Sequence, residues 1–121
     1  MTEIRNTKVR QFDLEDRTLS FAKEVVIFVN KLPKILTNIE ISKQLVRAAG
    51  SVGANYIEAN ESLSKKDFIM RIKICRKEAK EARYWLKLLS CNNECNEALP
   101  GLIQESTELM KIFGAILEKT K

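Results

Sequence analysis

The 121-residue sequence contains no histidine, only four glycines and only two prolines. Without histidine, the chain cannot supply the Glu-x-x-His ligands of a di-iron helical bundle. A glycine-rich phosphate loop and a nucleophile elbow are also missing, which argues against an enzyme. The scarcity of glycine and proline disfavours a turn-rich all-β protein. No stretch of about 18 apolar residues occurs, so no membrane-spanning helix is expected. The N-terminus lacks the apolar segment of a signal peptide, which makes the cytoplasm the expected location.

Cysteine is scarce as well, with Cys75, Cys91 and Cys95 as the three examples. An odd number of cysteines without an export signal predicts free thiols and not a disulfide framework. Cys75 falls on an apolar stripe, where it would pack as a small hydrophobic residue. Cys91 and Cys95 could hold half of a zinc site, but completing it would require several subunits. We therefore expect no metal and no cofactor.

Hydrophobic residues make up 45% of the chain and charged residues 31%, which are ordinary values for one globular domain spanning residues 1–121. Apolar residues recur every three or four positions in four segments that end near residues 32, 62, 89 and 120. Short polar connections between them predict an all-α protein, an up-down-up-down antiparallel four-helix bundle. Residues 1–12 lack this period and are expected to form a loose N-terminal arm.

Helix boundaries are indicated by capping residues. Asp13 or Asp16 can cap the first helix. Thr37 and Ser64, each followed three residues later by an acidic residue, predict capping boxes for the second and third helices. Pro100 suits the first turn of a fourth helix, where a missing N–H has no cost.

The first helix carries two adjacent apolar stripes, more than one face of a helix in a small bundle normally buries. One reading is a wide core face, and the other is contact with a second subunit. Trp85 in the third helix has the same two readings, as a rim residue of the core or as an interface anchor. The sequence predicts an oligomer interface formed by Phe21, Val25, Phe28, Leu32 and Trp85.

The third helix concentrates positive charge. The whole chain has a net charge of +5, yet residues 65–89 alone hold nine Lys or Arg against three acidic residues. Six of these cations share an arc beside the apolar seam: Lys73, Arg76, Lys77, Lys80, Arg83 and Lys87. Such a face suits phosphates, with Tyr84 available to stack on a base. It also fits an acidic protein surface or a merely solvated face, and Glu78 and Glu81 could blunt it by pairing within the helix.

The second helix combines small residues at positions 48–54 with a polar stripe. Small side chains allow two helix axes to approach closely. The polar stripe is either solvated or part of a polar network between subunits. It consists of Gln44, Arg47, Ser51, Asn55 and Glu58.

This polar stripe and the Ser64-Lys-Lys-Asp-Phe-Ile69 segment resemble those of the four-helix-bundle proteins encoded in 23S rRNA intervening sequences. The Phe12-Asp-Leu-Glu15 segment is similar to the family's opening. The chain departs from the family at Gly53, where relatives often carry proline, at Ala59, where they carry glycine, and in lacking an early tryptophan. The resemblance implies a bacterial homo-oligomer, with pentameric rings known in the family. It also implies likeness to accessory proteins of diversity-generating retroelements, basic pentamers that bind nucleic acid and a reverse transcriptase. It adds no catalytic residues.

Together these features predict a non-enzymatic homo-oligomer, a pentamer by resemblance, that binds structured RNA or DNA through the basic face of its third helix. The alternative is an oligomeric scaffold whose basic face meets an acidic protein. No membrane partner is expected in either case.

Overall fold

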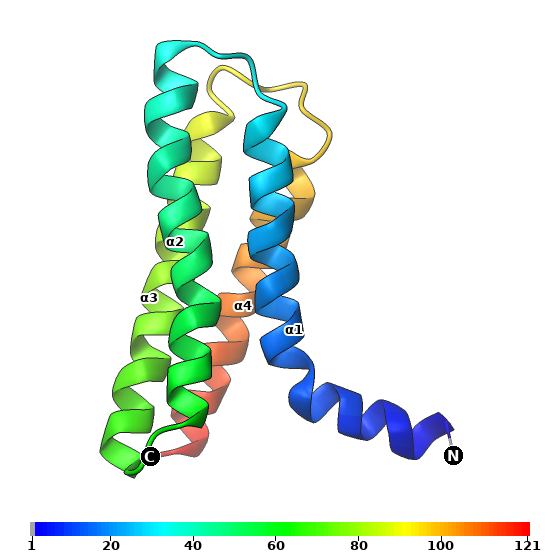
Figure 1. Cartoon of the computed structure of the whole chain (residues 1–121), viewed down its shortest axis with the longest axis vertical. Coiled ribbons are helices and arrows are strands. Elements are labelled where there is room, and N and C mark those ends of the chain that lie inside the picture. Colours follow the sequence, from blue (N-terminus) through cyan, green and yellow to red (C-terminus); the bar gives the residue numbers. More distant parts are fainter. Residues whose placement is uncertain (1) are drawn as a thin grey trace.

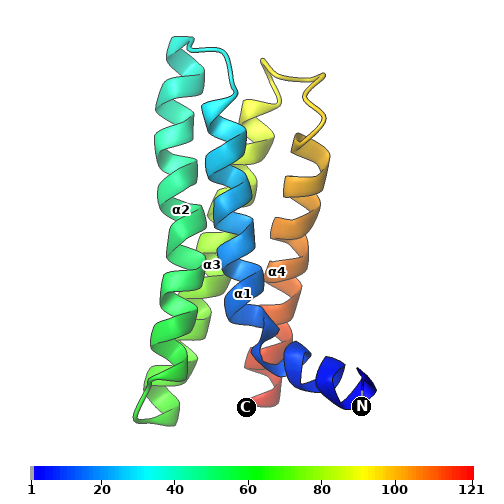
Figure 2. The same ribbon diagram turned by 45° about the vertical axis from the view of Figure 1, so that its right-hand side comes forward.

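In a computed structural model of the protein, the backbone is described for residues 2–121 and the side chains for residues 14–121. Over that range the chain forms four helices, α1 (Thr2–Asn30), α2 (Leu36–Asn60), α3 (Lys65–Leu89) and α4 (Leu99–Lys119). Each helix packs antiparallel against the next one in sequence, and α4 also contacts α1 (Figures 1 and 2). The predicted all-α up-down-up-down bundle is therefore confirmed. Within this range no helix is both long and apolar enough to cross a membrane.

The N-terminal part of α1 differs from the predicted boundary. The helix begins at Thr2, and its first turns project away from the bundle (Figure 1). Asp13 and Asp16 consequently lie inside α1, so the prediction that one of them caps its start is wrong. The side chains of residues 1–13 lie outside the described ones, so the loose character of the arm at residues 1–12 stays a prediction.

The other helix starts follow the predicted capping only in part. The Ser64 side chain accepts a hydrogen bond of 3.1 Å from the Asp67 backbone N–H, which confirms this residue as the N-cap of α3. Helix α2 instead begins one residue before Thr37, after Ile35 and without a side-chain cap. The Thr37 hydroxyl accepts a hydrogen bond from the Asn92 side chain in the α3–α4 loop. The Thr37 hydroxyl therefore joins the first turn of α2 to the α3–α4 loop and does not cap the helix, so the predicted cap is wrong.

The core draws on all four helices and corrects the predicted interface. Because α1 packs on both α2 and α4, its stripe of Phe21, Val25, Phe28 and Leu32 faces inward. These four side chains are buried within one chain and cannot form an exposed interface. The exposed apolar residues of α1 belong to the neighbouring face and are Leu19, Val26 and Ile27.

The small residues of α2 permit the close approach of α1 that the sequence predicts. A Cβ atom added at Gly53 would lie only 3.0 Å from Thr18 Oγ1. Thr18 is buried, and its hydroxyl donates to the carbonyl of Leu14 at 2.9 Å. A bidentate ion pair from Arg17 to Glu105, with contacts of 2.7 and 2.8 Å, joins the same region of α1 to α4. These contacts fix α1 against α2 and α4.

Candidate nucleic-acid interface

Helix α3 separates apolar and cationic residues onto opposite faces. Its inward face buries Ile72, Cys75, Ala79, Ala82 and Leu86, which pack against α2 and α4. Five of the six cations predicted to form the basic face are exposed. They are Lys73, Arg76, Lys77, Lys80 and Lys87.

The sixth predicted cation, Arg83, lies apart from the others. It is half-buried, and its Nη1 atom lies 4.0 Å from the sulfur of Met110 on α4. Its Nε–H is buried and has no hydrogen-bond partner within residues 14–121. The Arg83 side chain packs toward α4 and is less exposed than the other five cations, and its place in the interface stays a prediction.

Sequence reasoning missed one member of the exposed face, Lys66. Lys66, Lys73, Lys80 and Lys87 recur every seven residues, and all four are exposed. Seven residues make nearly two helical turns, so these lysines follow one line of about 32 Å along α3. We call this line the lysine row. The seven-residue spacing is readable from the sequence, but it starts in the first turn of α3, outside the arc of six predicted cations.

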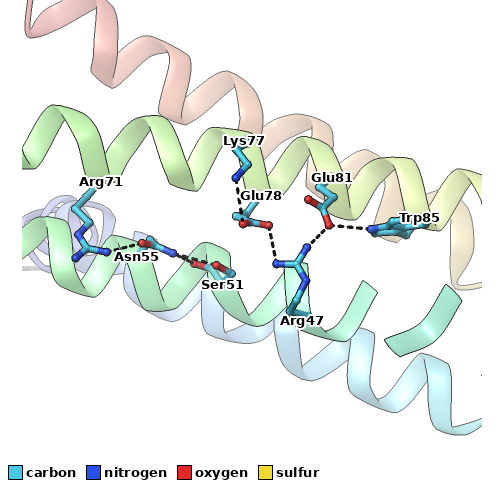
Figure 3. Close-up of polar contacts among 8 residues, drawn as sticks. All are labelled: Arg47, Ser51, Asn55, Arg71, Lys77, Glu78, Glu81 and Trp85. Atoms are coloured by element: carbon cyan, nitrogen blue, oxygen red, sulfur yellow. Dashed lines mark hydrogen bonds and ion pairs between the residues drawn. The ribbon is translucent and has the colours of Figure 1, made fainter. Parts of the chain in front are cut away.

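The lysine row is not neutralised from within the chain. Among residues 14–121, none of its four lysines has an acidic partner, and Arg76 has none either. The two carboxylates of α3 expected to pair with the basic face are Glu78 and Glu81. Both turn instead toward Arg47 on α2 (Figure 3). These two carboxylates therefore do not neutralise the basic face as predicted, apart from one long contact of 3.9 Å between Lys77 and Glu78.

Arg47, Glu78, Glu81 and Trp85 form a connected cluster that we call the Arg47 network (Figure 3). Arg47 Nη1 donates to Glu78 Oε1 at 3.4 Å, and Nη2 donates to Glu81 Oε2. The same Glu81 oxygen accepts a 3.1 Å hydrogen bond from Trp85 Nε1. Hydrogen bonds from Trp85 and then from Arg47 lower the pKa of Glu81 from its ordinary value. The ionised carboxylates in turn raise the pKa of Arg47. The network therefore holds three charges in fixed positions between α2 and α3.

The rest of the polar stripe of α2 meets α3 one to two turns away. Asn55 donates to the Ser51 carbonyl and hydroxyl, and its Oδ1 accepts a 2.9 Å hydrogen bond from Arg71 (Figure 3). Gln44 and Glu58 are exposed, and neither side chain has a partner within residues 14–121. The stripe is thus bonded within one chain over its middle and solvated at its ends. A network between subunits stays a prediction.

Two aromatic residues connect the Arg47 network to the basic face. Trp85 is half-buried against the core, as the rim reading predicts. Its place in an oligomer interface stays a prediction. The Tyr84 ring stands edge-on to Trp85, with centroids 5.0 Å apart and planes at 76°. Tyr84 is 58% exposed and lies beside the lysine row.

The sequence and the bundle have known counterparts. A family described as 23S rRNA-intervening sequence protein matches residues 10–115. A 1.70 Å crystal structure of a protein of unknown function, from the S23 ribosomal protein family of Bacteroides thetaiotaomicron VPI-5482, is similar at 32% identity and a TM-score of 0.74. That alignment covers 85% of this chain and 96% of the other. No curated protein matches. Because the matched segment spans most of the sequence and includes α2, α3 and the residues described above, the chain belongs to the 23S rRNA-intervening sequence protein family.

Proposed function

We propose that this protein is a non-enzymatic homo-oligomer that binds nucleic acid through the lysine row of α3. The observation that carries the proposal is four exposed, aligned lysines without an acidic partner in residues 14–121. Lysines that contact phosphates release condensed counterions, so affinity falls steeply with salt and depends little on base sequence. Unpaired lysines favour this role because an ion pair within the chain would have to break before a phosphate could bind.

The carboxylates of α3 favour a structural over a catalytic role. Glu78 is buried, and Arg47 and Lys77 are its partners. Glu81 is held by Arg47 and Trp85. A general acid or base must be free to reach a substrate proton. Both carboxylates are already engaged, and the sequence offers no histidine to take their place.

Exposed apolar surface on α1 and α2 supports self-association. A groove between these helices is lined by Leu19, Ala22, Gly50, Ala54 and Ile57, with Leu19 and Ile57 about half exposed. Contiguous apolar surface of this kind commonly marks an interface between proteins. We propose that further copies of the chain cover it, in a ring of five as the family resemblance implies. Each added copy would add a lysine row to the assembly.

The decisive test replaces Lys73 and Lys80 together by glutamate. Lys77 is left in place because it contacts Glu78. The matched control is Lys111→Glu with Lys119→Glu on α4, which changes the net charge equally at exposed positions. Because the family name refers to 23S rRNA, a 23S rRNA fragment is the first probe.

We expect the α3 variant to lose retention on RNA, and the logarithmic salt slope to fall by about 1.5, since two phosphate contacts are lost. Helicity and oligomer size, from circular dichroism and light scattering, should stay unchanged. Equal RNA affinity of the α3 and α4 variants would refute the proposed interface.

A scaffold that binds an acidic protein is the second candidate. The exposed side chains of Met70 and Leu88, which flank the lysine row, favour it because apolar residues beside charges are typical of protein interfaces. Polyglutamate separates the two functions. If it matches RNA in affinity and in salt dependence, charge alone decides binding and the scaffold function is the better account.

A further inference from the structure

We infer that the lysine row binds nucleic acid as a single strand, with Tyr84 stacking on an unpaired base while lysines on either side contact the flanking phosphates. This inference rests on the proposed function and adds the class of nucleic acid to it. It follows from the position of Tyr84, from the way its ring is supported, and from the shape of the surface.

Tyr84 lies beside the lysine row, between two of its members along the chain. It follows Lys80 by four residues and precedes Lys87 by three, so it is a neighbour of both on the helix surface. Its ring is 58% exposed, which leaves room for a planar ligand. An exposed aromatic ring between two unpaired cations is the arrangement with which single-strand-binding proteins hold a base and its adjoining phosphates.

The Tyr84 ring is held in place by its neighbour Trp85. The two rings form a T-shaped pair with centroids 5.0 Å apart, and Trp85 is itself fixed by its hydrogen bond to Glu81. Arg47 holds Glu81 from α2 (Figure 3). A ring that is already oriented loses less conformational freedom when a base stacks on it. Arg47 is therefore a positioning residue for the aromatic contact, although it does not lie on the outer face of α3.

The shape of the surface favours a single strand over a duplex. The lysine row follows the outer side of one helix, and the deep, narrow major groove of an RNA duplex does not let side chains read the bases inside it. Unpaired bases, in contrast, can turn outward and stack on an aromatic ring. A shallow hollow with Ile69 and Met70 between Lys66 and Lys73 offers a second apolar contact for a base. It lies near the start of α3, so a strand laid along the row would pass both places.

The test compares a single-stranded RNA of about ten nucleotides, a length within the usual site sizes, with a blunt duplex of the same length. Three variants are measured: Tyr84→Ala, Tyr84→Phe and Leu88→Ala. The last is the control, because Leu88 is an exposed apolar residue one turn further along α3 and has no ring. The single tryptophan lies against Tyr84, so its fluorescence provides a direct signal of binding at this place.

We expect Tyr84→Ala to weaken single-strand binding by about 5- to 150-fold, the range for losing one stacked base, and to leave duplex binding unchanged. Tyr84→Phe should bind as the unaltered protein does, and Leu88→Ala should differ by less than about twofold. Single-strand affinity that is insensitive to Tyr84→Ala would overturn the inference, as would a stronger preference for the duplex. A changed oligomer size in Tyr84→Ala would do so too, because it would place the ring in a protein interface.

These outcomes are distinct from failure of the proposed function. If the unaltered protein binds neither RNA, the proposed function fails. If it binds both equally and only Lys73→Glu with Lys80→Glu reduces binding, the proposed function stands and the single-strand inference fails.

Discussion

Replacing Arg47 by methionine tests whether the Arg47 network stabilises the bundle. Methionine keeps an unbranched apolar stem similar to that of arginine but removes the guanidinium. The Glu78 side chain is only 8% exposed, and after the exchange its sole remaining cation among residues 14–121 is Lys77 at 3.9 Å. Glu81 would keep its hydrogen bond from Trp85 but lose its ion pair. The exchange thus leaves one buried carboxylate nearly uncompensated.

The expected loss can be bounded from the burial of the two partners. Breaking a fully buried ion pair costs about 3–5 kcal/mol, whereas exposed pairs contribute about 0–1 kcal/mol. Here the carboxylate is buried but the Arg47 side chain is 49% exposed, so water screens part of the interaction. We therefore expect Arg47→Met to lower the free energy of unfolding by about 1–2 kcal/mol. For a domain of this size that corresponds to a fall in Tm of about 4–10 °C.

The control is Lys43→Met on the same helix. Lys43 pairs with Glu40, but both side chains are at least 60% exposed, so this exchange removes the same charge at an expected cost below about 0.5 kcal/mol. Denaturation by urea at one fixed protein concentration measures both variants. Adding Glu78→Gln to Arg47→Met should recover part of the loss, because it removes the buried charge. Equal stability of Arg47→Met and Lys43→Met would refute the reasoning.

Four further predictions concern the bundle itself. Burial raises the pKa of the Cys75 thiol to about 12, so iodoacetamide at pH 8 should label only the two exposed loop cysteines until urea is added, as mass spectrometry would show. Gly50→Ala should stabilise α2 by up to about 1 kcal/mol, since a Cβ there meets nothing within 4 Å. Gly53→Val should destabilise by about 1–3 kcal/mol, because its side chain would meet Thr18; equal Tm values for the two glycine variants would contradict this. The lowered pKa of Glu81 gives a stabilising contribution that is present above the ordinary carboxyl pKa of 4.5 and is lost as the pH falls through the lower folded value. Tryptophan fluorescence of the folded protein should follow that titration at a pH below 4.5, and a midpoint at or above 4.5 would contradict the assignment.

The sequence predicts the bundle well because its helices are long and periodic, and because Ser64 and Pro100 mark their starts. The sequence does not predict which face of a helix is buried where that depends on how the helices are rotated against one another. Both apolar stripes of α1 have the same period, and only packing on α2 and α4 selects that of Phe21 for the core. Thr37 has the form of a cap, but a loop distant in sequence takes its hydroxyl.

In the candidate site, too, some features follow from the sequence of α3 alone and others depend on how the helices pack. The basic face of α3 is visible from a helical projection, and the five exposed cations that the sequence predicts for it need no tertiary information. The orientation of the Arg83 side chain does depend on tertiary structure, because Met110, whose sulfur lies 4.0 Å from its Nη1 atom, belongs to α4. The pairing of Glu78 and Glu81 depends on it too, because their partner Arg47 lies on α2, more than 30 residues earlier in the chain, whereas Glu81 has Lys77 four residues before it as a local alternative.

That last competition links the stability of the bundle to its proposed binding surface. In α3 alone, Glu81 has Lys77 four residues before it and could pair with it, as such neighbours do on isolated helices. Packing on α2 draws the carboxylate toward Arg47 instead, away from the lysines. The folded bundle therefore displays more unpaired positive charge than the α3 sequence would by itself. Arg47→Met should then weaken RNA binding more than Lys43→Met does, although the two exchanges change the net charge equally and Arg47 lies off the outer face. Equal RNA affinities of these two variants, measured at one salt concentration with both fully folded, would show that the basic face of α3, Lys77 included, does not depend on Arg47.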